Sequence, residues 1–260
     1  MITKAQIQFI RSLEHKRVRD DSGCFLAECD KLVREALDLP KRSPFQVITI
    51  CGVARWLDSN LSDRENPNTE VIPVSVRELE RISLLKTPNQ VLAVISHDIS
   101  TSPEFDFGSE LLIGLNQVQD PGNVGTIIRL ADWFGLGGVI ASGDSADFYS
   151  PKVVQSSMGS IFRVNLVTAD LHDFIQSLPS GFPVYGTHLD GQNLYTAEIT
   201  THGLILLGNE SKGLRGDLSE LAMVNIRIPD FSRRQSKPES LNVSIAAAIV
   251  CSEFRRRGNG

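Results

Sequence analysis

The chain has 260 residues, 41 % hydrophobic and 22 % charged, a balance that is typical of folded globular proteins and excludes a disordered one. No apolar run approaches the roughly 18 residues of a membrane span, and the charged N-terminal segment lacks the apolar core of a secretory signal, so we expect a cytoplasmic protein. The net charge of −5 does not exclude a nucleic-acid partner, because residues 1–42 carry nine Lys and Arg against seven Asp and Glu, and residues 212–260 carry nine against five. Since salt screens charge over about 10 Å, two basic ends can attract phosphates although the middle of the chain is acidic.

The cysteines and histidines predict neither disulfides nor a metal site. The five histidines are scattered along the chain, whereas zinc sites need clustered ligands. The cysteines show no CxxC spacing, and in a protein without a secretory signal we expect reduced thiols. These four residues are Cys24, Cys29, Cys51 and Cys251.

Residues 1–97 alternate helix-like and strand-like patterns and are predicted to form a small α/β domain. Apolar residues recur at helical spacing within 3–19, and Ser75 with Glu78 forms the capping box of another helix. A segment rich in Ser, Pro, Asp and Gly at 98–109 breaks the periodicity and is predicted to link two domains. The other elements expected here are strands over 24–28, 45–52 and 90–96 and a helix over 31–39.

Residues 110–260 are predicted to form a second α/β domain. Short apolar strands alternate with helices, which indicates a parallel sheet covered on both faces. The expected strands are 111–118, 137–142, 162–167, 183–189, 203–210 and 224–230, and the expected helices are 123–136, 150–159, 171–178 and 242–257.

The first strand of this domain is followed by "QVQDPGNVGTIIRLADWFGL", which has the position but not the spacing of a dinucleotide-binding loop. That loop needs GxGxxG and an acidic residue about twenty positions later. Here only Gly122 and Gly125 are present, although Asp144 and Asp147 lie at a tolerable distance. Arg129 falls in an otherwise apolar helix and needs an anionic partner or a watery cleft; an ion pair with Asp132 is the structural alternative.

Two further segments carry polar residues at strand ends. The strand at 203–207 is followed by Gly208, Asn209 and Glu210, with Gly213 just beyond, so that backbone groups are free to bind a small ligand at the carboxyl edge of the sheet. The last helix is preceded by Ser240, Leu241 and Asn242, where a simple N-cap is the alternative interpretation.

These segments together resemble the SpoU (TrmH-type) family of RNA ribose 2′-O-methyltransferases. The three family motifs are matched by "QDPGNVGTIIRLADWFG", by "LLGNESKGL" and by "IP" followed by "SLNVSIAAAIV", and "SPKVVQSSMGSIFRV" resembles the segment that links the first two. The leading segment 11–37 resembles the family's substrate-binding domain, a small α/β fold related to a ribosomal RNA-binding protein, but Cys29 stands where many relatives have glycine. The loop at 230–239 is also longer and more basic than the usual link.

The resemblance implies a parallel-sheet domain tied in a deep trefoil knot, S-adenosylmethionine bound at that knot, and a homodimer with a site shared between subunits. It implies cofactor contacts at Thr187, Gly208, Ile228 and Leu241, beside Asn209 and Gly213 of the glycine loop. It implies catalytic or structural roles at the site for Asn123, Arg129, Glu210, Ser240 and Asn242.

The implied reaction is methyl transfer to a ribose 2′-hydroxyl. The N-terminal domain favours ribosomal RNA as the substrate, with transfer RNA as the alternative. The motifs contain no histidine, and a guanidinium stays protonated, so we expect Arg129 to hold a phosphate and stabilise alkoxide charge rather than act as a base. A non-catalytic RNA-binding protein on the same fold is the other alternative. The expected RNA surface comprises Arg233, Arg234 and Lys237, with Arg255, Arg256 and Arg257.

Overall fold

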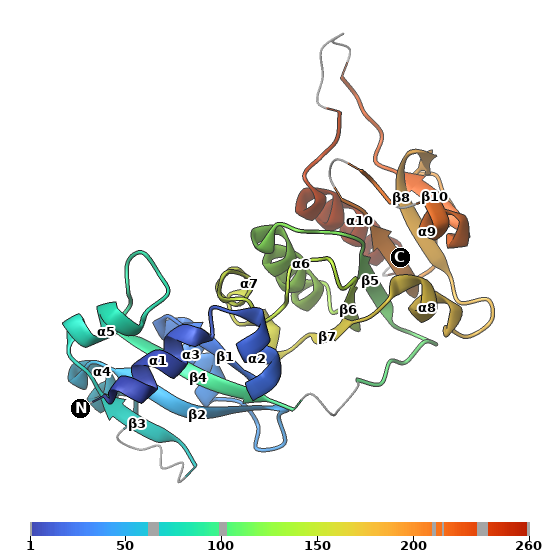
Figure 1. Ribbon diagram of the computed structural model, residues 1–260. Coiled ribbons are helices and arrows are strands. Elements are labelled where there is room, and N and C mark those ends of the chain that lie inside the picture. The colour runs from blue at the N-terminus through green and yellow to red at the C-terminus, as the bar shows by residue number, and fades with distance from the viewer. Residues whose placement is uncertain are drawn as a thin grey trace. The chain divides into compact units, whose positions relative to one another are not determined.

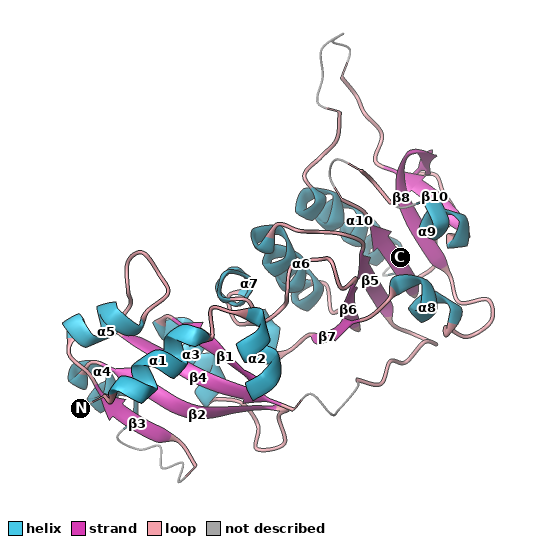
Figure 2. Cartoon of the chain, viewed as in Figure 1, coloured by secondary structure: helices cyan, strands magenta, loops and turns pink. Residues whose placement is uncertain are grey.

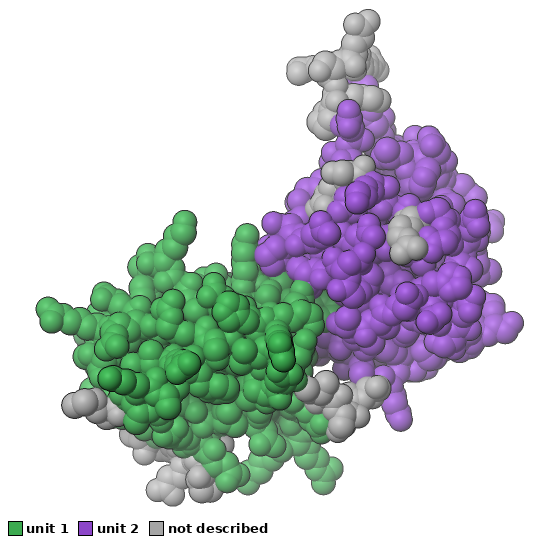
Figure 3. Space-filling view, in the orientation of Figure 1, with its two compact units in different colours: residues 1–102, 147–162 green, residues 103–146, 163–260 purple. Residues whose placement is uncertain are grey.

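The computed structural model describes residues 2–61, 68–98, 103–209, 212–214, 216–232 and 239–258. By packing, the chain divides into two compact units: unit 1 is Met1–Ser102 with Asp147–Phe162, and unit 2 is Pro103–Ala146 with Arg163–Gly260 (Figure 3). The segment 147–162 therefore packs with the N-terminal residues, although it falls inside the range 110–260 that the sequence assigns to the second domain. Among the described residues, no helix combines the length and apolarity needed to cross a membrane.

Unit 1 is a four-stranded mixed sheet with helices. The sheet order is β1-β4-β2-β3, in which only the β2–β3 pair is parallel. Its elements are α1 (Lys4–Ser12), α2 (Lys16–Ser22), β1 (Cys24–Glu28), α3 (Asp30–Leu37), β2 (Phe45–Gly52), α4 (Ala54–Leu61), β3 (Glu70–Pro73), α5 (Val76–Ile82), β4 (Val91–His97), α7 (Pro151–Ser157) and the 3₁₀ helix η1 (Ser160–Phe162) (Figures 1 and 2).

Two patterns in the sequence of unit 1 can be compared with the helices of the structure. The capping box of Ser75 and Glu78 is confirmed, because each side chain accepts from the other's backbone N–H. The helical spacing within 3–19 is confirmed by α1, but the segment forms two helices: the chain breaks after α1, and the buried Arg19 guanidinium binds the carbonyls of Leu13 and Glu14 at 2.7 Å each. Cys29, at the position where relatives have glycine, has φ of +124°, a conformation that favours glycine.

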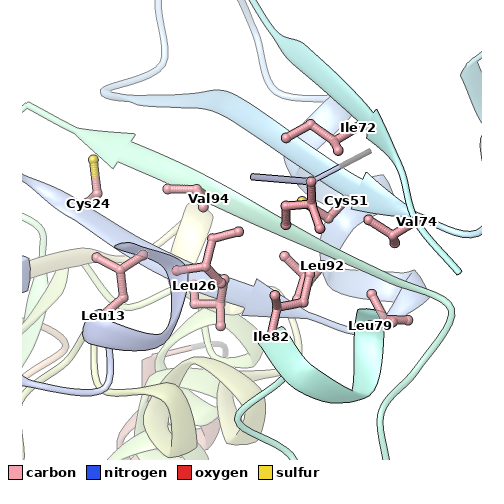
Figure 4. Close-up of a cluster of buried hydrophobic side chains, with 12 residues drawn as sticks. Leu13, Cys24, Leu26, Cys51, Ile72, Val74, Leu79, Ile82, Leu92 and Val94 are labelled. Atoms are coloured by element: carbon pink, nitrogen blue, oxygen red, sulfur yellow. The ribbon is translucent and has the colours of Figure 1, made fainter. Parts of the chain in front are cut away.

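Alternation along β1 explains why 147–162 joins unit 1. Cys24 and Leu26 point into one apolar core, formed with β2, β4 and α5 (Figure 4). Phe25 points the other way, where its ring centroid lies 5.0 Å from that of Tyr149 and 6.4 Å from that of Phe162. The segment 147–162 thus covers the second face of the sheet.

Unit 2 contains a six-stranded, entirely parallel sheet in the order β10-β8-β9-β5-β6-β7. The predicted α/β class is confirmed, and the central strands are buried along their whole length, as their continuous apolar sequences indicate. The elements are β5 (Leu111–Leu115), α6 (Pro121–Trp133), β6 (Gly138–Ala141), β7 (Asn165–Thr168), α8 (Leu171–Gln176), β8 (Val184–Asn193), β9 (Gly203–Leu207), α9 (Gly216–Leu221), β10 (Val224–Arg227) and α10 (Val243–Gly258) (Figure 1).

Helices cover both faces of this sheet. Leu112 and Leu204 pack with Leu171 of α8 and Leu218 of α9 on one face. On the other face lies α10, whose Phe254 ring meets Tyr185 edge-on at 4.9 Å, and α10 also packs against α6. Strand order does not fix how the chain threads, so the trefoil knot stays a prediction.

Candidate functional site

A cavity of about 340 Å³ opens at the carboxyl ends of β8 and β9, beside the point where the strand order reverses between β9 and β5. In open parallel sheets this is the usual place for a ligand. All six residues predicted as cofactor contacts, together with Ser240, line this one cavity. They are Thr187, Gly208, Asn209, Gly213, Ile228 and Leu241.

The loop after β9 is tight enough to demand glycine. A Cβ atom on Gly208 would lie 2.3 Å from the carbonyl carbon of Gly213, a distance that no side chain can accept. Gly213 has φ of +66° and its N–H donates to the carbonyl of Asn209 at 2.8 Å. The Asn209 side chain closes the turn further, because its Oδ1 accepts from the N–H of Lys212 at 3.2 Å. The two glycines therefore bring the backbone of the described loop residues up to the cavity.

An irregularity of β8 builds the opposite wall of the cavity. The pairing of β10 with β8 moves from Asn225–Gly186 directly to Ile226–Gln192, so residues 187–191 leave the sheet and return to it. Four of them, 187–190, line the cavity. Gly191 closes the bulge where a Cβ would lie 2.6 Å from the Ile226 carbonyl carbon. Sequence reasoning missed His188 and Asp190 here, along with Lys212 and Arg227; their only sequence signal is adjacency to predicted contacts.

Asn123 and Asn242 hold the N-termini of α6 and α10 together. The Asn242 Nδ2 donates to Asn123 Oδ1 at 3.0 Å, and the Asn242 Oδ1 accepts from the backbone N–H of Ser244 at 3.0 Å. Asn242 is thus the N-cap that the cautious interpretation expected, and it is a bridge between two motifs as well. Two helix N-termini at one place supply partial positive charge.

Arg129 lies on the exposed side of α6 and is not among the described residues that line the cavity. The alternative partner, Asp132, forms an ion pair with Arg163 at 2.8 Å. Within one chain, the structure therefore brings the predicted cofactor residues together but leaves Arg129 outside their cavity.

Two of the C-terminal arginines bind backbone carbonyls of the protein itself. Arg255 donates to the carbonyl oxygens of Phe134 and Gly135, and Arg257 donates to those of Leu194 and Ala197. These bonds give both side chains a role in the fold, and their assignment to an RNA surface stays a prediction. Glu210, Arg233, Arg234 and Lys237 lie outside the described residues.

The four cysteines are free, as expected, and three of them are buried. Burial raises the pKa of Cys51 and of Cys251 to about 12, so both thiols stay protonated and act as small apolar side chains.

A wholly parallel sheet with a ligand-sized cavity at its strand reversal defines a small-molecule-binding α/β domain, here joined to a small mixed-sheet unit. The chain belongs to the SpoU rRNA Methylase family, whose model matches residues 110–252, and residues 4–93 match the MRM3-like substrate binding domain. The resemblance predicted from the three motifs is thereby confirmed.

Similar proteins cover nearly the whole chain. The 23S rRNA (guanosine(2553)-2′-O)-methyltransferase RlmP of Bacillus subtilis is 29 % identical over 94 % of both chains. A structure from Porphyromonas gingivalis assigned to the TrmH family of RNA methyltransferases is 36 % identical, with a TM-score of 0.87 over 99 % of each chain. An AdoMet-bound rRNA methyltransferase from Sinorhizobium meliloti is 31 % identical, with a TM-score of 0.81 over 99 % of this chain and 96 % of that one.

Proposed function

We propose that this protein is an S-adenosylmethionine-dependent methyltransferase that methylates a ribose 2′-hydroxyl of ribosomal RNA. One observation carries the proposal: six residues from separate parts of the sequence, singled out as cofactor contacts, line a single cavity. The names of its relatives support the substrate class, since RlmP acts on 23S rRNA and the Sinorhizobium meliloti structure holds AdoMet. A cytoplasmic location is part of the proposal, because the enzyme must meet this RNA.

The cavity suits the cofactor in size and in chemistry. Its volume of about 340 Å³ falls within the range of small-molecule sites, roughly 300–1,000 Å³. Ile228, Leu241 and Leu207 supply apolar walls for an adenine ring, and the Gly208–Gly213 loop supplies backbone groups. When bound, S-adenosylmethionine supplies a methyl group on a positively charged sulfur.

The chain's own residues would align the acceptor and stabilise charge. Arg129 would hold a phosphate of the RNA through two parallel hydrogen bonds and stabilise the negative charge that develops on the 2′-oxygen. A guanidinium stays protonated at neutral pH, so Arg129 is assigned no base role. The Asn123–Asn242 pair would fix the helix ends beside which the ribose is held, and Ser240 would contact the ribose at the cavity. Glu210 keeps a supporting role in the loop after β9.

A second copy of the chain would complete the site. α6 exposes Trp133, which is 83 % accessible, on the same side as Arg129, and the adjoining α10 exposes Ile245 at 53 %. Large apolar side chains on two packed helices are a typical dimer surface. A homodimer formed there would cover this face. Arg129 would then act at the cofactor cavity of the partner subunit.

The test is a tritium-transfer assay with S-adenosylmethionine and purified ribosomal and transfer RNA, followed by ribose-methylation mapping in a deletion strain and its parent. We expect incorporation into ribosomal RNA and one 2′-O-methyl site missing in the deletion strain. Incorporation into transfer RNA alone would redirect the substrate, and the absence of transfer to either RNA would favour a non-catalytic RNA-binding protein.

A further inference from the structure

Gln117, the second residue after β5, is held in a backbone conformation that favours glycine. Its φ is +56°, and its carbonyl points toward the loop after β9 rather than along the sheet, where it accepts a hydrogen bond of 2.9 Å from Asn209 Nδ2. Neither the cavity nor the three motifs use the Gln117 side chain: Gln117 is absent from the described residues that line the cavity. A conformation of this kind persists only where neighbouring groups enforce it.

The loop after β6 enforces it. The backbone N–H of Gln117 donates to Ser142 Oγ at 3.0 Å, and the Gln117 Nε2 donates to Asp144 Oδ2 at 2.7 Å. Ser142 Oγ donates in turn to Asp144 Oδ1 at 2.6 Å. The next residue is fixed in the same way, because the N–H of Val118 donates to Ser145 Oγ at 3.1 Å. Three polar side chains of one loop thus set the direction of one carbonyl.

The Gln117 carbonyl is bonded to a residue that lines the cavity. Asn209 lines the cavity, and its amide group joins the Gln117 carbonyl on one side and the N–H of Lys212 on the other. Since Gly208 is packed against the backbone of Gly213, a shift of Asn209 would also displace these two glycines. The backbone N–H of Asn116 also donates to the carbonyl of Leu207 at 2.8 Å, so the chain after β5 is joined both to the end of β9 and, through Gln117, to Asn209.

We propose that Gln117, supported by Ser142, Asp144 and Ser145, is a positioning residue that holds the described residues of the loop after β9, which are Gly208, Asn209, Lys212 and Gly213, in their cofactor-binding arrangement. The proposal rests on the proposed function for its chemistry, since the ligand of that loop is S-adenosylmethionine. It also gives Asp144 a role: this residue does not bind a ribose, as a dinucleotide fold would require, but orients Gln117.

Two substitutions at one position test the proposal. Gln117→Gly keeps the carbonyl and accepts a positive φ without strain, whereas Gln117→Val carries a β-branched side chain that rejects this conformation. We expect Gln117→Val to raise the KM for S-adenosylmethionine by about tenfold or more with kcat at saturating cofactor within about threefold, and Gln117→Gly to stay within about threefold in both. Ser142→Ala should act in the same direction as Gln117→Val but less strongly, with Ser177→Ala on the exposed end of α8 as the matched control.

A double-substitution cycle and hydrogen exchange complete the experiment. If Gln117 acts through Asn209, then Gln117→Val adds little to Asn209→Ala, so the two effects on cofactor Kd are not additive. In the cofactor-free chain, Gln117→Val should speed the exchange of the Lys212 and Gly213 amides, while Gln117→Gly should not. Additive effects, or unchanged exchange of both amides, would overturn the positioning role. The hydrogen-exchange measurement needs no cofactor. Calorimetry of the wild-type protein with S-adenosylmethionine tests the proposed function separately.

Discussion

The glycine at the end of β9 is constrained by backbone alone. Because a Cβ on Gly208 would lie 2.3–2.4 Å from backbone atoms of Gly213 and Leu214, no rotamer of a neighbour can relieve the overlap. We expect Gly208→Ala to weaken S-adenosylmethionine binding at least tenfold, about 1.4 kcal/mol, by calorimetry. Gly216→Ala is the matched control, since nothing lies within 4 Å of a Cβ there. Equal affinity of the two variants would show that the loop does not shape the site.

Arg129 offers a second test at the level of a single side chain. Because it is exposed and outside the cavity lining, its removal should leave the cofactor site intact. We expect Arg129→Ala to abolish methyl transfer to RNA while calorimetric affinity for S-adenosylmethionine changes by no more than about threefold, and Arg129→Lys to rescue little, because a single ammonium cannot make a bidentate contact. A parallel loss of cofactor binding would contradict this division of roles.

At the scale of elements, two arginines in the last turn of α10 bind the side chain of Glu253. This side chain is 6 % exposed and accepts bonds from Arg256 and Arg257, while Arg257 reaches on to the loop carbonyls of Leu194 and Ala197. The hydrogen bond from Arg256, with that from Arg257, lowers the pKa of Glu253 to about 2. The last helix is thereby tied to the segment that follows β8.

These ion pairs predict how the stability of the protein depends on pH. Since the folded pKa of Glu253 lies below its usual value of 4.5, the stabilisation is fully present above pH 4.5 and is lost as the pH falls toward 2. We therefore expect Glu253→Gln to have a lower Tm than wild type at pH 7, with a difference that shrinks between pH 4.5 and pH 2 in a calorimetric series. Glu220→Gln, at an exposed site on α9, serves as the control. A Tm difference that is constant across this range would rule out the ion pairs as its source.

At the scale of the whole molecule, the dimer proposed on α6 and α10 has a direct test. Placing a carboxylate on the apolar face costs desolvation and should separate the subunits, so we expect Trp133→Glu to halve the mass measured by sedimentation and to reduce methyl transfer at least tenfold, on the order of 1.4 kcal/mol in the barrier. Met223→Glu is the matched control, because Met223 is 64 % exposed and lies between α9 and β10. A wild-type monomer, or a Trp133→Glu dimer, would refute this surface.

Much of the site was predictable because its motifs are local. Gly208, Asn209 and Gly213 directly follow an apolar strand, and the carboxyl ends of parallel strands meet at one edge, so these residues could be assigned to a cavity without coordinates. The wall formed by residues 188–190 could not be, since their departure from β8 depends on pairing with β10, more than thirty residues later. The same holds for Gln117, whose conformation depends on the loop after β6.

The sequence by itself determined that the second half is an α/β domain with a parallel sheet. Strands buried on both faces need unbroken apolar runs, and such runs can be recognised directly in the amino-acid sequence. Through the resemblance of its motifs, it also singled out six residues that line one cavity. Only the tertiary structure decided that 147–162 packs with unit 1 and that Arg255 and Arg257 bind loop carbonyls. Burial of Phe25 against Tyr149 and the capture of distant carbonyls are contacts between residues far apart in the chain, and no local periodicity encodes them.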